Sequence, residues 1–365
     1  MLKIAHLTSA HQRYDTRIFL KMCSSLAQHG FDTSLIVADG NGDERKNNVQ
    51  IYDVGAKGTK RIHRMTVTVR KVYTRAKALD ADVYHLHDPE LMFVAWKLKL
   101  SGKRVIFDAH EDLPKQLLGK AYLNAVSRVV LSKVFALTES LLCARLDAVV
   151  CATPSIGEKF KKINRQTLVI NNYPILDELS TRKPWEQRED AICYVGCMDS
   201  YRGAKELVHS IGLTDAKLKF AGVFSDEALK NEVKTYTGWK QVIDYGFIDR
   251  KGVAELMSES KAGLVIFHAI PNHIDAQPNK MFEYMSAGLP IIVSNFPLWK
   301  QVVEENDCGI CVDPLNANEI AQAIRTIIEH PEKSSAMGTN GQEAVVKKYN
   351  WGVESKKLTA LYEEF

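Results

Sequence analysis

The sequence predicts an α/β protein built from two doubly wound, Rossmann-like domains. Short runs rich in Val, Ile and Leu alternate with segments of helical periodicity, as they do in βαβ units around a parallel sheet. The alternation stops at a charged, proline-interrupted stretch, 180–190, and then starts again. The 365 residues are long for one domain and sufficient for two separate cores. We therefore expect domains at 1–175 and 176–345, followed by a terminal helix at 346–365.

The composition excludes several classes of protein. Hydrophobic residues make up 45% and charged residues 25%, which is typical of soluble globular proteins. The net charge of +4 is too small to indicate a nucleic-acid partner. No uncharged apolar run reaches the roughly 18 residues of a membrane span, and the N-terminus is typical of a first strand rather than a signal peptide. Seven cysteines without framework spacing favour a reducing cytosol, so we expect a cytoplasmic protein.

Cofactor motifs are weak or missing. No GxGxxG follows the first strand of either domain, which argues against a dinucleotide. Cys308 and Cys311 form a lone CxxC without a matching pair, and no DxD follows a strand at a place suited to a metal. We expect neither a cofactor nor a metal.

The first domain shows strand and helix patterns in alternation. Strands are expected at 3–8, 31–38, 49–54, 82–86, 103–107, 147–152 and 167–170. Helices are expected at 18–27, 87–99 and 121–145. Because the carboxyl ends of parallel strands meet at one edge of the sheet, the loops that follow them should lie together.

The loop after the first strand contains no glycine but several charged residues. Arg13 and Arg17 could bind a phosphate or an acceptor through their guanidinium groups. Alternatively, Asp15 caps the following helix and the two arginines are simply solvated.

Two histidines follow later strands. A lone histidine is more often a hydrogen-bonded structural residue than a catalytic one. His110, in the polar segment DAHED just beyond a strand, is a stronger active-site candidate than His87.

The segment 57–77 is strongly basic and contains no Asp or Glu. Ile62, Met65, Val69 and Val72 recur in it at helical spacing. Such a helix either binds an anionic ligand or membrane surface, or is only the solvated face of a core helix.

The second domain repeats the alternation. Strands are expected at 191–195, 218–221, 242–245, 263–267 and 291–293. Helices are expected at 205–211, before 236, at 253–257, from Pro278 to 289, and at 316–330, 331–348 and 351–365.

The stretch 262–293 organises this domain. A buried strand leads through a polar loop into a helix, and backbone N–H groups near Gln277, Asn279 and Lys280 could hold a phosphate. Glu283, one turn into the helix, could accept hydrogen bonds from a ribose diol, and Asp275 precedes it by eight residues. The alternative is an ordinary strand, loop and helix with a solvated carboxylate.

The segment PNKMFEYMSAGLPII resembles the donor-binding segment of glycosyltransferase family 4, whose members are retaining enzymes with the GT-B fold. The resemblance implies two Rossmann-like domains facing a central cleft. It also implies that Asp275 and Glu283 take the places of two acidic residues eight apart, with Asp275 shortened from the usual Glu. Gln277, Pro278 and Asn279 replace a glycine-rich loop.

The same resemblance assigns further residues. Gly196 ends the first strand of the second domain; the family's Arg falls on Cys197, which cannot bind phosphate, and its Lys falls on Arg202, which can. His110 matches the histidine that meets the donor sugar. Residues matching the loops of the base pocket are Gly222, Phe247 and Ile248.

The resemblance implies a retaining, metal-independent hexosyltransferase of cell-surface polysaccharide synthesis. Its donor would be a UDP- or GDP-linked sugar, and its acceptor a glycan or a polyprenyl-diphosphate-linked glycan on the first domain. The terminal helix would cross back onto the first domain, and the basic segment 57–77 could hold the protein on the anionic inner face of the plasma membrane. Alternatives are an epimerase or hydrolase of nucleotide sugars, or a non-catalytic binding protein, which the departures at Cys197 and Asp275 would suit.

Overall fold

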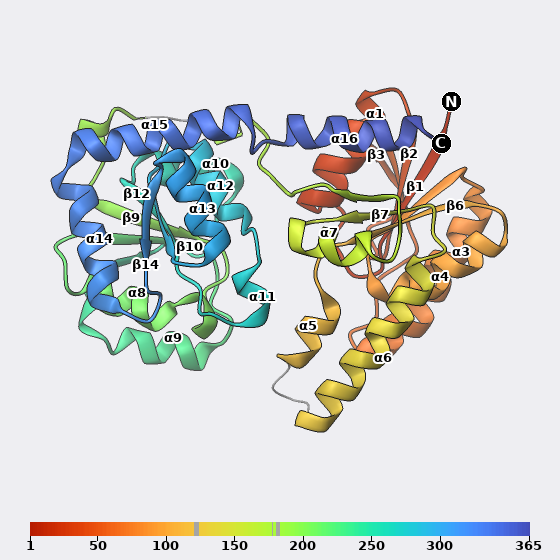
Figure 1. Cartoon of the computed structure of the whole chain (residues 1–365), viewed down its shortest axis with the longest axis horizontal. Helices are drawn as coiled ribbons and strands as arrows, with labels where there is room; N and C mark the ends of the chain where they lie inside the picture. Colours follow the sequence, from red (N-terminus) through yellow and green to blue (C-terminus); the bar gives the residue numbers. More distant parts are fainter. Residues whose placement is uncertain (120–123, 177, 180–182) are drawn as a thin grey trace. The chain divides into compact units, whose positions relative to one another are not determined.

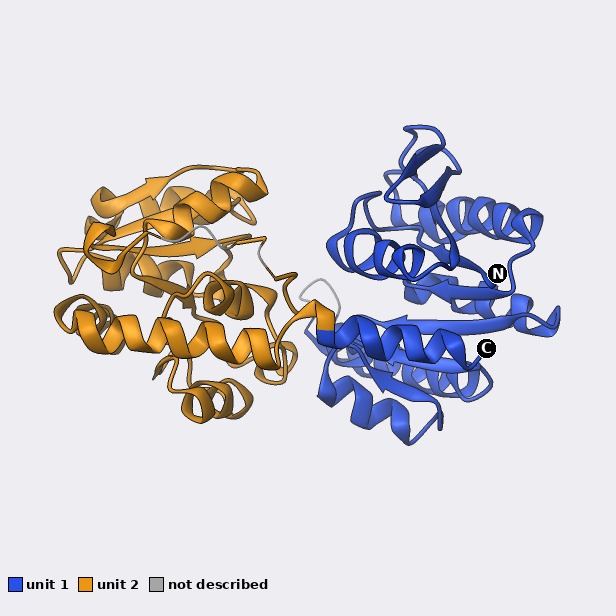
Figure 2. Cartoon of the chain, turned by 90° about the horizontal axis from the view of Figure 1, so that it is seen from above, with its two compact units in different colours: residues 1–172, 353–365 blue, residues 173–352 orange. Residues whose placement is uncertain are grey.

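A computed structural model describes residues 1–119, 124–176, 178–179 and 183–365. The chain divides into two compact units, shown in separate colours in Figure 2. Unit 1 comprises Met1–Asn172 together with Val353–Phe365, and unit 2 comprises Tyr173–Gly352. Residues 121–123 of the first predicted long helix and 180–182 of the predicted linker lie outside the described residues.

Unit 1 is built on an eight-stranded sheet in the order β3-β4-β2-β1-β5-β6-β7-β8. Only the short hairpin of β3 with β4 is antiparallel among the described strands. The strands are β1 Lys3–Leu7, β2 Asp32–Val37, β3 Glu44–Lys46, β4 Val49–Asp53, β5 Val83–Leu86, β6 Arg104–Ala109, β7 Ala148–Cys151 and β8 Thr167–Val169. The chain reverses its direction of travel through the sheet between β1 and β5, so a crevice is expected beyond their carboxyl ends.

The helices of unit 1 lie beside this sheet (Figure 1). They are η1 Thr16–Cys23, α1 Ser24–Gln28, α2 Arg61–His63, η2 Arg64–Thr68, α3 Val69–Leu79, η3 Pro89–Leu91, α4 Met92–Leu100, α5 Leu113–Leu118, α6 Ala125–Cys143 and α7 Pro154–Lys161. The terminal helix α16, Trp351–Glu363, contributes its residues from Val353 onward to the same unit.

Unit 2 has a six-stranded, fully parallel sheet in the order β11-β10-β9-β12-β13-β14. Its strands are β9 Ala191–Val195, β10 Lys217–Ala221, β11 Val242–Asp244, β12 Ala262–Val265, β13 Ile291–Ser294 and β14 Gly309–Val312. Its helices are η4 Trp185–Gln187, η5 Ser200–Arg202, α8 Ala204–Ile211, α9 Glu227–Lys234, η6 Thr237–Gln241, α10 Arg250–Ser258, α11 Pro271–Ile274, α12 Asn279–Ser286, α13 Pro297–Asn306, α14 Ala317–Glu329 and α15 Pro331–Lys347. The switch point lies between β9 and β12.

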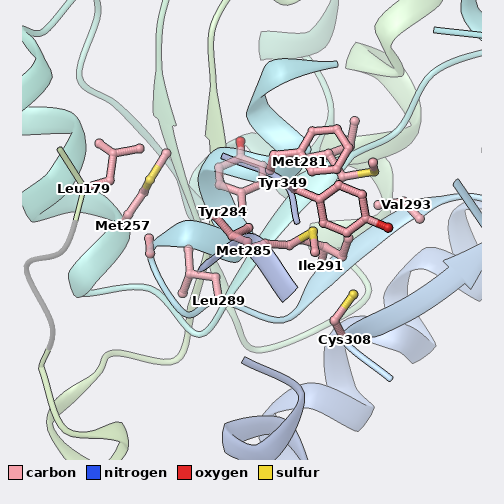
Figure 3. Close-up of a cluster of buried hydrophobic side chains, with 14 of the residues drawn as sticks. Leu179, Met257, Met281, Tyr284, Met285, Leu289, Ile291, Val293, Cys308 and Tyr349 are labelled. Atoms are coloured by element: carbon pink, nitrogen blue, oxygen red, sulfur yellow. The ribbon is translucent and has the colours of Figure 1, made fainter. Parts of the chain in front are cut away.

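The core of unit 2 fixes the helix α12 against the sheet. Met281, Tyr284 and Met285 are fully buried on one face of α12 and lie among the apolar side chains drawn in Figure 3. A Cβ on Gly263 of β12 would lie 2.2 Å from the Tyr284 ring, so glycine is what lets the helix approach the strand. The Tyr284 hydroxyl accepts a hydrogen bond from the Val195 N–H at 2.8 Å. Helix α12 is thereby held to both strands that flank the switch point.

The predicted α/β class with two parallel-sheet domains is confirmed, and each predicted strand is present within a few residues. The sequence patterns missed the short strands β3 and β14 and the helices α5, α7 and α13. The basic segment is helical from Arg61 to Leu79, but its predicted apolar stripe is only partly buried, since Ile62 is 76% exposed and Met65 46%. None of the described helices combines the length and apolarity that a membrane span requires.

Candidate functional site

The carboxyl ends of β9 and β12 in unit 2 bring together Gly196, Arg202 and Lys280. Gly196 has φ +112° and Gly222, after β10, has φ +154°. A Cβ on Gly222 would lie 2.0 Å from the Gly196 carbonyl oxygen, so only glycine permits these two strand-end loops to touch. The result is an open backbone floor at the switch point, where ligands of such sheets bind.

Lys280 lies directly over this floor. A Cβ on Gly196 would be 3.6 Å from its Nζ, and the Nζ lies 3.6 Å from the centroid of the Tyr194 ring. The Nζ is shielded from solvent and has no hydrogen-bond partner among the described residues. Burial, reinforced by the positive charge of Arg202, lowers the pKa of Lys280 to about 7. Glu283 and Asp199 are near enough to oppose this lowering, but among the described residues no carboxylate is hydrogen-bonded to the Nζ.

Arg202 is the second cation of the site. Its Nη1 donates to the Cys197 carbonyl oxygen at 3.2 Å, and its Nε lies 3.4 Å from an Asp199 carboxylate oxygen. The Asp199 carboxylate also accepts from the Arg202 N–H at 2.8 Å, which fixes the short helix η5. The Arg202 side chain is 35% exposed, so its remaining donors can reach a ligand. Cys197 contributes only its carbonyl oxygen to these contacts.

The N-terminus of α12 faces the same strand ends. Pro278 precedes the helix and offers no side-chain cap, which leaves the first backbone N–H groups, those of Asn279 and Lys280, to bind an anion. The loop that precedes α12 is held by the helix α13, because Trp299 Nε1 of α13 donates to the Ala276 carbonyl at 2.6 Å. Gln277 lies in this anchored loop, 3.5 Å from the Tyr173 hydroxyl.

Glu283 is held by a residue that the sequence patterns did not single out. Arg250 donates from Nη1 to Glu283 Oε1 at 3.0 Å, and its Nε and Nη2 bind Glu178 at 2.9 and 2.8 Å. The second carboxylate oxygen of Glu283, Oε2, receives no hydrogen bond from the described residues. The only signal for Arg250 in the sequence is its place at the start of α10, a few residues after the strand β11. Asp275 follows α11 at the far end of the loop.

The loops beyond β10 and β11 supply an exposed aromatic ring. The Gly222 N–H donates to the Gly246 carbonyl at 2.7 Å, which joins the two loops. Phe247 follows directly and is 85% exposed, while Ile248 packs against the core of unit 2. An exposed Phe on a fixed loop suits stacking against a flat ligand.

In unit 1, the carboxyl ends of β1, β5 and β6 carry a buried charge network. Asp108 accepts two hydrogen bonds from Arg17, at 2.9 and 2.8 Å, and the remaining Arg17 contact goes to the Ile170 carbonyl at 2.8 Å. His87 Nδ1 and His110 Nε2 lie 3.2 and 3.1 Å from the same carboxylate. Burial opposes ionisation of Asp108, but Arg17 and His110 outweigh it and hold the carboxyl pKa well below its usual value.

The two arginines predicted to bind a ligand, Arg13 and Arg17, form ion pairs within unit 1. Arg13 donates to both oxygens of Asp39, at 2.9 and 2.8 Å, and to Glu44 at 2.9 Å. Asp15 caps the helix η1 by accepting from the N–H groups of Arg17 and Ile18, as one of the two interpretations expected. The arginines are, however, buried ion-pair partners rather than solvated side chains, so their contact with a ligand stays a prediction.

A chain of aromatic side chains extends from this network to the terminal helix. His6 Nδ1 lies 2.8 Å from His87 Nε2, and His85 Nδ1 lies 2.7 Å from the Tyr362 hydroxyl. Burial lowers the pKa of His87 to about 4, and it also lowers those of His6 and His85. Neutral rings can each donate once and accept once, which fits a hydrogen-bonded chain. Sequence patterns gave no signal for Tyr362, because it lies 277 residues from His85.

Two sets of these side chains also have the chemistry of metal ligands. In each set the ligand atoms lie within 4.8 Å of one another, the sets being His6, His85 and His87, and His87, Asp108 and His110. Most of these atoms are already hydrogen-bonded to one another, which is the arrangement of a polar network rather than of an open ligand set.

Comparison with known proteins gives a consistent result for both units. Residues 177–344 match the family model of glycosyl transferases group 1, and residues 16–172 match that of Glycosyltransferase Family 4. D-rhamnosyltransferase WbpZ of Pseudomonas aeruginosa is 25% identical over 285 residues, covering 73% of this chain and 70% of that protein. A GDP-mannose-dependent alpha-(1-6)-phosphatidylinositol monomannoside mannosyltransferase of Mycobacterium tuberculosis is 29% identical over 76 residues, 21% of this chain and 20% of that one.

Solved structures share the fold over the whole chain. Sucrose-phosphate synthase from Thermosynechococcus elongatus has a TM-score of 0.80 at 19% identity, covering 100% of this chain and 99% of that one. Anabaena Alr3699/HepE in complex with UDP-glucose has a TM-score of 0.77 at 13% identity and covers 100% of both chains. At these identities the likeness establishes the fold alone.

Proposed function

The chain belongs to glycosyltransferase family 4 and is a glycosyltransferase of the GT-B type that acts on sugar donors; we propose that it is a retaining, metal-independent hexosyltransferase. The proposed donor is a UDP- or GDP-linked sugar, bound by the strand-end loops of unit 2. We propose either uracil or guanine as the base of the donor, because a mannosyltransferase relative is named for GDP-mannose and a structural neighbour is in complex with UDP-glucose.

One observation carries the proposal: the shielded Nζ of Lys280, without a hydrogen-bond partner among the described residues. A buried ammonium group that is not hydrogen-bonded to an anion is unfavourable unless a ligand provides the negative charge. The Lys280 amine, the Arg202 guanidinium and the first N–H groups of α12 all point to one anion, and a nucleoside diphosphate supplies it. Lys280 thus replaces the charge that the family's arginine would place at Cys197.

The proposed reaction places the developing charge on this site. The bond between the sugar C1 and the diphosphate oxygen breaks while the acceptor oxygen bonds C1 from the same face, and the acceptor proton passes to a departing phosphate oxygen. Arg202 and Lys280 stabilise the leaving diphosphate. One well-placed donor group contributes on the order of 10²–10³-fold to such a step.

Other residues are proposed to orient the donor. The Glu283 carboxylate, fixed by Arg250, accepts hydrogen bonds from the ribose diol, and Phe247 with Ile248 borders the base. Asp275 and His110 are proposed to contact the sugar. These assignments follow the family resemblance and the positions of the residues at strand ends.

The proposed acceptor is a glycan or a polyprenyl-diphosphate-linked glycan of cell-surface polysaccharide synthesis, used at the inner face of the plasma membrane. The basic segment 57–77 supports this placement, because it presents cations without any acidic residue of its own.

A donor panel tests the function directly. The full chain is incubated with UDP- and GDP-linked hexoses, with and without polyprenyl-diphosphate-linked acceptors, and the products are separated by mass. Release of nucleotide diphosphate together with an extended acceptor supports the proposal. Isomerised or hydrolysed donor without transfer would make the chain an epimerase or hydrolase, and binding without turnover would make it a binding protein.

A further inference from the structure

The long helix α6 of unit 1 turns its apolar face outward. Residues of this face recur every three or four positions and therefore form one stripe along the helix. The stripe consists of Val126, Val130, Val134, Leu137 and Leu141, which are 74%, 52%, 57%, 62% and 51% exposed. In Figure 1, α6 runs beside α5 and its first turns extend past the rest of unit 1. Monomeric proteins rarely expose an apolar patch of this extent unless it binds something.

The opposite face of α6 is polar and fixed inward. Ser132 is buried and donates through Oγ to the Pro114 carbonyl at 2.9 Å. Glu139 is buried and forms an ion pair with Lys159. Rotating the helix to bury its valines and leucines would break both contacts and leave charged groups unpaired. The outward apolar stripe is therefore specified by the structure.

The exposed charges of α6 and of its C-terminal end are positive. Lys133 is exposed on the stripe itself, and Arg145, also exposed, follows the end of the helix. Glu139 is the one acidic residue of α6, and Lys159 neutralises it inside the unit. An apolar stripe bordered by cations complements an anionic lipid surface.

A second copy of the chain is the competing occupant. Lys133 lies at the middle of the stripe, between Val126 and Leu141, so a symmetric helix pair would bring it close to its own copy. Like charges at the centre of an apolar interface are unfavourable. On a membrane the same side chain can extend along the helix and place its amine among the phosphates.

We propose that the outward face of α6 docks unit 1 on an anionic membrane, with the stripe inserted at the boundary of headgroups and acyl chains. This deepens the proposed location of the enzyme but does not depend on sugar transfer. It names a hydrophobic anchor separate from the basic segment 57–77.

Vesicle flotation tests the proposal with the full chain and no donor present. Phosphatidylcholine vesicles are used with and without phosphatidylglycerol. The protein should float with the anionic vesicles, and the double variant Val134→Glu, Leu137→Glu should reduce the bound fraction by roughly tenfold or more. Leu315→Glu is the matched control, because Leu315 is 65% exposed in unit 2, and it should bind like the parent.

The remaining outcomes separate the alternatives. Binding unaffected by the α6 variant but abolished by changing Arg61, Arg64, Arg70 and Lys71 to Gln would overturn the proposal in favour of the basic segment. A lipid-free dimer in analytical ultracentrifugation that the α6 variant makes monomeric would overturn it in favour of a second copy. Vesicle binding in a protein without transferase activity would support the membrane surface and refute only the proposed function.

Discussion

The two units place cations at equivalent points of similar sheets and treat them in opposite ways. In unit 1, Arg17 lies beyond the switch point of β1 and β5, and its guanidinium is bound by Asp108 and a carbonyl group. In unit 2, Lys280 lies at the switch point of β9 and β12, and its amine has no hydrogen-bond partner among the described residues. A charged side chain whose hydrogen bonds are complete within the protein stabilises the fold, whereas one without such hydrogen bonds can bind a ligand.

The difference also appears in the pKa values of the two sites. Arg17 helps hold the pKa of Asp108 well below its usual value, so that pair is ionised at neutral pH. The pKa of Lys280 falls to about 7, because the ammonium is buried near a second cation. The charge state of Asp108 in unit 1 is therefore fixed by contacts within the folded protein, whereas that of Lys280 in unit 2 depends on a bound ligand.

The largest expected effect is the loss of Asp108. Asp108→Ala leaves the Arg17 guanidinium buried without its counter-ion, and breaking a buried pair from one side costs roughly 3–5 kcal/mol of unfolding free energy. Urea denaturation followed by circular dichroism measures this loss. Adding Arg17→Met to the variant should recover part of it, because the unpaired charge is removed.

The exposed pair of Lys161 and Glu158 provides the control for that experiment. Glu158→Ala should leave the denaturation midpoint unchanged, since both side chains are in water. If Asp108→Ala behaved like this control, the pair in unit 1 would not be structural and the comparison would fail.

The second expected effect concerns catalysis in unit 2. Arg202→Ala should lower turnover by roughly 10²–10³-fold, because the guanidinium is needed most as the diphosphate departs. Its unfolding free energy should change far less than that of Asp108→Ala. Arg202→Lys should restore part of the rate, since a lysine retains the charge. Parent-like turnover in both variants would place the phosphate contact elsewhere.

The sequence predicted the sheets and the strand-end loops well, because strands with continuous apolar runs and parallel order are local features. Pairing between distant residues was not accessible. Arg17 lies 91 residues from Asp108, and Arg250 lies 33 residues from Glu283, so no local pattern joins either pair. Which arginine is buried depends on such tertiary partners rather than on its neighbours in sequence.

The orientation of α6 shows a second limit. Periodicity identifies the apolar face of a helix, and the usual inference is that this face is buried. In α6 that inference is wrong, because the buried face carries Ser132 and Glu139, whose partners Pro114 and Lys159 come from other elements. The sequence gives the stripe, and the tertiary contacts decide the direction in which it points.

The smallest expected effect is also the sharpest test of the comparison: the affinity of unit 2 for UDP or GDP should depend on pH through Lys280. The unliganded pKa is about 7, and a bound diphosphate raises it by supplying negative charge. Below pH 7 the amine is charged with or without ligand, so Lys280 adds no pH dependence to the affinity there. Above pH 7 binding must take up a proton, and affinity should fall by up to about tenfold per pH unit.

Stability should move in the opposite direction over the same range. Lys280 titrates near its usual 10.5 in the unfolded chain and near 7 in the folded one. Between these values the unfolded state holds more protons, so the unliganded protein should become more stable as pH rises. Calorimetry of nucleotide binding and urea denaturation, each from pH 6 to 9, measure the two slopes, and Lys280→Met should flatten both. Lys251→Met is the matched control, because Lys251 is exposed on α10 and should leave both slopes as they are. If the parent and Lys280→Met had the same slopes, the amine would be charged in the free protein, and the contrast with Arg17 would rest on geometry alone.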